Sequence, residues 1–277
     1  MKKLNLATIM VFKITFKVLR QNAVLPYSYQ YELSAWIYKM IADSNSQLAT
    51  FLHNKGYTQG FKNFKLFTFS NLYLPQFNTT PQGLEILSPT IDFTISFLVD
   101  QAAESMIKTL FEQHAFILGN KHSQVPLQVE SIHTQPFSID SNTLQFRTTS
   151  PLVVSNFEVT DQGNTQAKYL PPTHNQYEAL FFKNLLAKYK SALQHQVIVA
   201  SPGSNCTPTT PMHFKLLDSR VRSKLIEIKT GKASATKVRG YLFDFELTAP
   251  QDLLKVGYLS GFGGQSAMGF GACKILK

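Results

Sequence analysis

The chain has 277 residues, a length that suits two domains of moderate size, and a charged share of 16% without low-complexity runs excludes a disordered protein. Its 27 Lys and Arg residues against 17 Asp and Glu give a formal net charge of +10, which favours a phosphate-rich partner. Two cysteines exclude a disulfide framework, and no apolar segment reaches membrane-spanning length, so we expect a cytoplasmic protein without a membrane partner.

The first half of the chain contains the periodic patterns of a small α+β domain. Alternating apolar residues predict strands, and apolar residues three and four positions apart predict helices. The expected elements are a strand at Phe12–Val18, a helix around Leu33–Met40, strands at Leu66–Phe69 and Ile91–Phe97, and a helix around Ala103–Phe111. Either Ala115–Leu118 or Leu127–Ile132 supplies a closing strand. This β-α-β-β-α-β order predicts a ferredoxin-like unit, in which two helices cover one face of a sheet.

The second half of the chain shows the same kinds of strand and helix pattern. Its expected elements are strands at Thr143–Thr149, Leu225–Ile228, Val238–Leu247 and Met268–Leu276, helices at Gln176–Ala192 and Asp252–Tyr258, and Leu127–Ile132 as a further strand unless the first domain uses it. Thr160–His174 and Ser201–Met212 are rich in Pro, Thr, Asn and Gly and are expected to be loops. We therefore predict an α+β fold of two tandem ferredoxin-like (RRM-like) domains, residues 1–122 and 123–277.

A glycine-rich segment near the end of the chain holds five of the 14 glycines, namely Gly261, Gly263, Gly264, Gly269 and Gly271. Glycine permits positive φ and lets backbone amides approach a phosphate closely. The segment lacks the Lys-Ser/Thr ending of a Walker loop. Two interpretations remain, contact with an RNA backbone or a tight bulged hairpin before the last strand.

The residues before this segment carry a concentration of positive charge. Glu227 is the only acidic residue among seven basic ones, which are Arg220, Arg222, Lys224, Lys229, Lys232, Lys237 and Arg239. A hairpin with Thr230-Gly231-Lys232 at its tip could hold an RNA stem through phosphates and 2′-hydroxyls. The alternative is a charged edge strand that protects the protein against aggregation.

Motifs at both ends of the chain resemble one known family. The run from Asp252 to Gly271 resembles the C-terminal signature of the CRISPR-associated Cas six (Cas6) endoribonucleases of the RAMP superfamily. The stretches Leu25–Tyr38, Ser44–His53 and Lys65–Ser70 resemble the opening blocks of the same family. Residues from roughly 120 to 210 carry little motif content, so the resemblance depends on two ends that match in order.

The resemblance implies a metal-independent endoribonuclease that cleaves CRISPR repeat RNA in the precursor transcript. The ribose 2′-hydroxyl attacks the adjacent phosphate and leaves a 2′,3′-cyclic phosphate and a 5′-hydroxyl, which requires a base, an acid and positive charge. No Asp/Glu cluster or His pair has metal-ligand spacing, so neither a metal nor another cofactor is expected. Subunits of a CRISPR effector complex and a second copy of the chain are the further partners we consider.

The resemblance also indicates which residues act. His53 would be a general acid or base, since histidine alone titrates near neutral pH without perturbation. Tyr38 would be its partner, with the two roles left open, and Lys65 would stabilise the charge of the phosphorane, with Lys55 or Lys62 as alternatives. A non-catalytic repeat-RNA-binding subunit of a CRISPR effector complex is the competing function, and a buried His53 would favour it.

Overall fold

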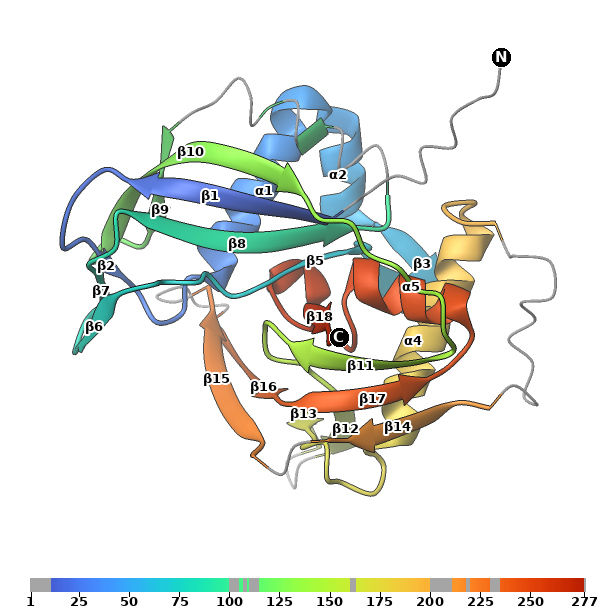
Figure 1. Ribbon diagram of the computed structural model, residues 1–277. Coiled ribbons are helices and arrows are strands. Elements are labelled where there is room, and N and C mark those ends of the chain that lie inside the picture. Colours follow the sequence, from blue (N-terminus) through green and yellow to red (C-terminus); the bar gives the residue numbers. More distant parts are fainter. Residues whose placement is uncertain are drawn as a thin grey trace, which may run out of the picture.

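The computed structural model describes residues 11–99, 105–106, 109, 115–159, 163–199, 211–217, 220–229 and 235–276. Two sheets lie one above the other in Figure 1, and helices cover one side of each. Among the described residues, no helix is both long and apolar enough to cross a membrane.

The first sheet has five strands in the order β5-β8-β1-β10-β9, and neighbouring strands are antiparallel. Its strands are β1 (Val11–Val18), β5 (Phe67–Phe69), β8 (Thr90–Phe97), β9 (Ala115–Gly119) and β10 (Gln124–Thr134). The alternation of β1 is confirmed, because Phe12, Ile14 and Phe16 are buried while Lys17 is exposed. When β9 is left out, the neighbours across the sheet are the second, third, first and fourth of its strands in chain order, as in a ferredoxin-like domain.

Helix α1 (Gln30–Ser44) packs on this sheet, and helix α2 (Ser46–Asn54) packs against α1. Helix α1 buries the predicted stripe, and its Trp36 stacks on Phe116 of β9 with ring centroids 4.3 Å apart. Helix α2 follows at once, and Asn45 caps it by accepting a hydrogen bond from the Leu48 amide at 3.0 Å. The helix expected around Ala103–Phe111 lies outside the described residues except for Ser105, Met106 and Thr109.

Short strands that the sequence patterns did not predict connect these elements. They form a three-stranded sheet and a hairpin, made of β2 (Val24–Leu25), β7 (Gly83–Ile86) and β6 (Phe77–Thr80), and of β3 (Tyr57–Gln59) with β4 (Lys62–Phe64). Each strand has two to four residues. Such short strands carry too little alternation to stand out in a sequence.

The second sheet has the order β14-β17-β11-β18, which is again second, third, first and fourth. Its elements are β11 (Thr143–Thr148), α4 (Tyr177–Gln194), β14 (His213–Leu216), β17 (Asp244–Thr248), α5 (Gln251–Ser260) and β18 (Cys273–Ile275). Aromatic side chains fill the space between the sheet and the helices, and Phe262 contacts Phe146, Phe181 and Phe245 with ring centroids 5.1–5.8 Å apart. Both sheets thus have the strand order of the predicted tandem ferredoxin-like fold.

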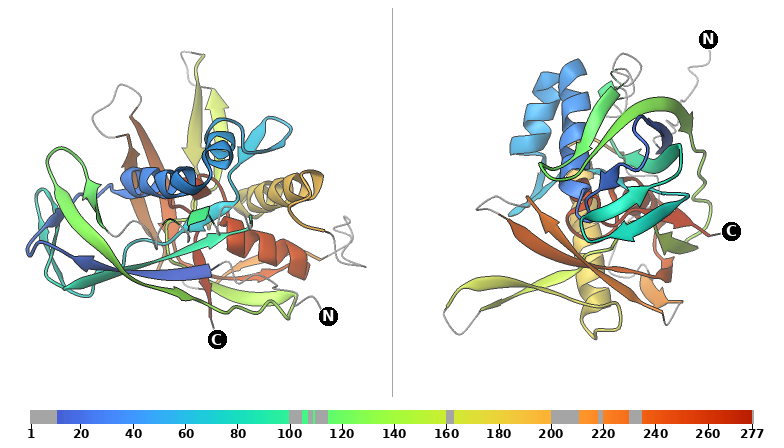
Figure 2. Two further views of the ribbon diagram at one scale, coloured as in Figure 1. Left: turned by 90° about the horizontal axis from the view of Figure 1, so that it is seen from above. Right: turned by 90° about the vertical axis from the view of Figure 1, so that its left-hand side faces the viewer.

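Two predictions for this half are wrong. The strand expected at Val238–Leu247 is divided into β16 (Thr236–Leu242) and β17. The division falls at Phe243, because the Thr148 hydroxyl donates a hydrogen bond to the Phe243 carbonyl and accepts one from the Phe243 amide. The loop expected at Thr160–His174 contains β13 (Thr165–Tyr169), which pairs with β12 (Ser155–Val159). That hairpin and the ribbon of β16 with β15 (Arg222–Ile228) project from the body of the molecule (Figure 2). Backbone pairing, which residue composition does not encode, stabilises both.

Strand β10 bears on where the two halves of the chain meet. The open alternative at Leu127–Ile132 is decided by β10, which pairs with β1 over Leu127–Thr134 and therefore belongs to the first sheet. The expected closing strand at Met268–Leu276 shortens to β18, since Ser266–Met268 forms a 3-10 turn. We propose that the domain junction lies between residues 134 and 143 rather than near residue 122.

Candidate active site

His53 and Tyr38 lie side by side on the two helices of the first domain. His53 is an exposed residue in the last turn of α2, and Tyr38 is half-buried on α1. The edge of one ring faces the other, with centroids 6.0 Å apart and planes at 81°. Burial raises the pKa of the Tyr38 phenol well above its usual value of 10.0, so this group stays protonated at neutral pH.

Lys65 joins this pair from the chain between β4 and β5. Its Nζ donates a hydrogen bond to the His53 carbonyl oxygen at 3.0 Å, and this carbonyl is one of those left without a helical partner at the end of α2. Burial lowers the pKa of the Lys65 ammonium. Gly56 makes this approach possible, because a Cβ there would lie 2.4 Å from the Phe64 carbonyl oxygen and 3.0 Å from the Lys65 side chain. The structure thus brings the three predicted residues together.

A cleft of about 320 Å³ opens beside them and is lined by both domains. Its walls include Tyr38 and Lys65 from the first domain and Lys188, Gly264 and Gln265 from the second. A shallower groove of about 320 Å³ runs along the other side of Tyr38 and contains His53. Tyr38 therefore lines both hollows, and Lys65 connects them through its hydrogen bond to His53.

The alternative lysines occupy different places. Lys62 lines the same cleft as Lys65, and its pKa is lowered by burial and by the nearby positive charge of Lys183. Lys55 is exposed and lines a separate hollow with Ser46 and Phe51. The geometry therefore favours Lys65 or Lys62 over Lys55 for contact with a ligand in the cleft.

The sequence patterns missed Lys188 of α4, which is only 1% exposed. Its Nζ donates hydrogen bonds to the carbonyl oxygens of Ser260 and Gly261, at the end of α5. Burial, with a smaller contribution from the positive charge of Lys62, lowers the pKa of Lys188 to about 7. The spacing from Phe181 and Leu185 places position 188 on the buried side of α4, and this was the one available signal.

This burial predicts a pH dependence of stability. The folded protein holds a proton on Lys188 less tightly than the unfolded chain does, so the unfolded chain binds more protons between pH 7 and about 10.5. The contribution of Lys188 to the free energy of unfolding should therefore rise as pH increases through this window. Urea unfolding of the wild type and of Lys188→Met at pH 7 and pH 9 measures it, and equal pH dependence in the two proteins would contradict the prediction.

The glycine-rich segment packs between the two domains. Ser34 of α1 donates to the Ala267 carbonyl at 2.7 Å, and Thr68 of β5 donates to the Phe270 carbonyl at 2.9 Å. Figure 1 shows this red segment between the two sheets, next to α5. The segment is therefore a structural connection between the domains as well as one wall of the cleft.

The five glycines differ in what they offer to a ligand. Gly261, Gly263, Gly269 and Gly271 are buried with positive φ, and Gly264 is partly exposed. The amides of Gly264, Gly269 and Gly271 donate to the carbonyls of Val153, Ser266 and Pro151. These contacts favour the packing interpretation for most of the segment. Among the five glycines, Gly263 and Gly264 line the cleft. RNA contact therefore stays a prediction for these two.

The basic residues lie on and beside the ribbon of β15 and β16. Its apolar side, with Ile226 and Val238, packs on Phe270 of the glycine-rich segment. Arg220, Arg222, Lys237 and Arg239 are exposed, Lys224 and Lys229 are half-buried, and Lys232 lies outside the described residues together with the predicted tip. Burial lowers the pKa of Lys224. The predicted hairpin is present, and RNA binding by these residues stays a prediction.

Comparisons with known proteins cover nearly the whole chain. Residues 24–126 match the family model for the N-terminal part of the CRISPR-associated protein Cas6, and residues 133–275 match the model for its C-terminal part. A CRISPR-associated endoribonuclease Cas6 from Methanocaldococcus jannaschii is 29% identical over 90% of this chain and 86% of its own length. Another, from Pyrococcus furiosus, is 26% identical over 91% and 83%.

Solved structures agree on the fold. A structure described as that of a Cas6-related gene from Pyrococcus furiosus has a TM-score of 0.78 and 21% identity, covering 97% of this chain and 98% of the other. A RAMP protein described as binding different RNA substrates has a TM-score of 0.77 and 18% identity, with coverage of 97% and 100%.

Proposed function

Because the chain belongs to the Cas6 family of CRISPR-associated proteins, we propose that it is a metal-independent endoribonuclease that cleaves CRISPR repeat RNA. The curated relatives named above are endoribonucleases. The net charge of +10 fits a partner that carries one negative charge per nucleotide.

One observation carries the catalytic part of this proposal. Tyr38, His53 and Lys65 come from three different segments of the chain, yet Tyr38 contacts His53 and Lys65 donates to the His53 carbonyl. Tyr38 and Lys65 line the cleft between the domains, and His53 lines the adjoining groove. A phenol, an imidazole and an ammonium are the groups that transfer of a phosphodiester to its neighbouring 2′-hydroxyl requires without a metal.

The surroundings suggest how the roles are divided. The raised pKa of Tyr38 makes its phenol a hydrogen-bond donor or acid rather than a base at neutral pH. The exposed imidazole of His53 can accept the proton of the 2′-hydroxyl, and the phenol can donate to the 5′-oxygen that leaves. Lys65 would face the developing negative charge on the phosphate, with Lys62 as the alternative in the same cleft.

The competing function, a repeat-RNA-binding subunit without activity, uses the same surface. A buried His53 would favour that function, whereas His53 is exposed at the end of α2. An exposed imidazole beside a protonated phenol can exchange protons with bound RNA, and a subunit that only binds RNA does not need this pair. The enzyme is therefore the better supported of the two functions.

Incubation with the cognate repeat RNA in excess EDTA tests the proposal. We expect cleavage at one position within the repeat, with a 2′,3′-cyclic phosphate and a 5′-hydroxyl as products. RNA ends are identified by their response to phosphatase and kinase treatment. RNA that stays bound but intact would favour the binding subunit, and cleavage that EDTA abolishes would exclude the metal-independent mechanism.

A further inference from the structure

Helix α4 contributes an amide side chain to the cleft, and the division of catalytic roles does not use it. This residue is Asn184, which lies four positions before Lys188. Both residues line the cleft that also contains Tyr38 and Lys65. Positions four apart share one face of a helix, so α4 presents both side chains to the same hollow.

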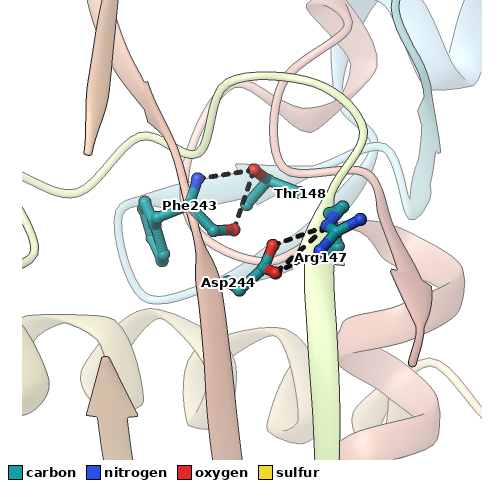
Figure 3. Close-up of polar contacts among 4 residues, drawn as sticks. All are labelled: Arg147, Thr148, Phe243 and Asp244. Carbon is teal, nitrogen blue, oxygen red and sulfur yellow. Dashed lines mark hydrogen bonds and ion pairs between the residues drawn. The ribbon is translucent and has the colours of Figure 1, made fainter. Parts of the chain in front are cut away.

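The amide oxygen of Asn184 is a buried acceptor that no donor satisfies. Among the described residues that line the cleft, only Asn184 has a buried side-chain oxygen or nitrogen without a hydrogen-bond partner. Figure 3 shows the ordinary, paired arrangement on the second sheet. There Arg147 binds the Asp244 carboxylate at 2.6 Å, and the Thr148 hydroxyl bonds to the backbone of its neighbour. An unpaired buried acceptor costs free energy in the free protein, and a ligand that supplies a donor recovers it.

The wall that carries Asn184 is held in place at two points. Lys188 donates hydrogen bonds to two carbonyl oxygens at the end of α5, where the glycine-rich segment begins. At the end of α4, His195 accepts a hydrogen bond from the Thr58 amide at 3.1 Å, which attaches the β3–β4 hairpin to this helix. The same hairpin supplies Lys62 to the cleft. The amide of Asn184 and the lysines opposite it therefore belong to one fixed frame, as selective recognition of a ligand requires.

The chemistry of the missing partner excludes a phosphate. A phosphodiester offers only acceptors, which suit the ammonium groups of Lys62 and Lys65 and not an amide oxygen. A nucleobase carries N–H donors beside acceptors along one edge, and unpaired bases in RNA are recognised along such edges. The side chain of Asn184 has the complementary pair, an oxygen that accepts and an NH₂ group that donates.

We propose that Asn184 is a specificity-determining residue, which recognises the base of a nucleotide next to the cleaved phosphate. Adenine fits best, because its N6 amino group would donate to the amide oxygen while its N7 accepts from the amide NH₂ group. The cleft volume of about 320 Å³ lies in the range of sites that hold small molecules. The inference rests on the proposed function, because it takes the cleft to be the place where RNA is cut.

Repeat RNAs that differ in one base test this recognition. The base on each side of the cleavage position is varied in turn to all four, and a 2′-deoxynucleotide at that position prevents cutting. Fluorescence anisotropy gives the Kd of each RNA. At one of the two positions, we expect the wild type to bind the adenine form about 10-fold more tightly than the others, as one bidentate contact between an amide and a base provides. Asn184→Ala should bind all four forms with Kd values within a factor of about two.

Gln194→Ala is the matched control. It removes an exposed amide from the last turn of the same helix, at a position that does not line the cleft, and it should keep the base preference of the wild type. Thermal unfolding separates recognition from a structural role. Because the amide oxygen of Asn184 has no partner in the free protein, Asn184→Ala should have a Tm equal to or above that of the wild type.

Three results would each overturn the proposal. They are a Tm of Asn184→Ala several degrees below the wild type, the same base preference in both proteins, and a wild type that binds all four forms equally. The last result is also what contact of Asn184 with a ribose hydroxyl predicts. Cleavage of the all-ribose RNA by the wild type is scored separately. A base preference that Asn184→Ala loses would support the recognition even if the RNA stayed uncut, and that combination would refute the nuclease alone.

Discussion

Replacing His53 by alanine should slow cleavage of repeat RNA by about 10²- to 10⁴-fold, the range expected when a general acid or base is lost. The side chain is exposed at the last turn of α2, so its removal costs little in packing. The carbonyl oxygen that accepts the Lys65 hydrogen bond belongs to the backbone and stays in place. Single-turnover rates at saturating RNA, with affinity measured separately, give the effect on chemistry alone.

His122→Ala is the matched control for this variant. His122 is also exposed, but it lies in the turn before β10, away from both hollows that Tyr38 lines. Its replacement should leave the cleavage rate within a factor of two of the wild type, as other neutral surface changes do. A His53→Ala rate as high as that of His122→Ala would remove His53 from the reaction.

Replacing Gly271 by alanine should lower the free energy of unfolding by about 3 kcal/mol. Gly271 has a φ of 75°, a conformation that is strained for alanine, and a Cβ would lie 1.9 Å from the Phe262 carbonyl oxygen. The Phe262 backbone cannot move away freely, because its amide donates a hydrogen bond to the Gly271 carbonyl oxygen at 2.9 Å. Strain and overpacking each contribute on the order of 1–3 kcal/mol. Urea unfolding measures the loss.

Gly163→Ala distinguishes the two contributions. Gly163 has a φ of 76°, almost the same as Gly271, but a Cβ there would meet no atom of the described residues within 4 Å. This variant should lose only the strain of the left-handed conformation, about 1 kcal/mol. Equal losses at the two positions would mean that Gly271 is needed for its backbone conformation alone and not for close packing.

Local patterns explain why so much of the fold was predicted. Each of three predicted elements buries one face, and the residues on that face recur at a fixed spacing within a short stretch of sequence. These elements are the strands at Phe12–Val18 and Ile91–Phe97 and the helix at Leu33–Met40. The elements that were missed or misplaced depend on distant partners. A hydrogen bond from the Phe243 amide to Thr148 separates β16 from β17, and pairing with β1 places β10 in the first sheet.

The candidate site also combines residues that the sequence indicated with one that only the packing of distant segments revealed. The family resemblance placed His53, Tyr38 and Lys65 on the motifs of the first domain, and the structure brings them next to one another, with Tyr38 lining both the cleft and the groove that contains His53. Lys188 escaped notice because a lysine in a helix ordinarily faces solvent. Its burial follows from the packing of α4 against the end of α5, where the carbonyls of Ser260 and Gly261 accept its hydrogen bonds.

For this protein, the sequence alone determined the order of most helices and strands, the tandem ferredoxin-like fold and the family, because these depend on periodicity and on motifs within short stretches. Only the tertiary structure decided that the glycine-rich segment mainly joins the domains, that Lys188 lies buried in the cleft and that Arg147 pairs with Asp244. Such arrangements arise from strand register and packing between residues as far apart as 233 positions, as Ser34 and Ala267 are. No local pattern encodes contacts over that separation.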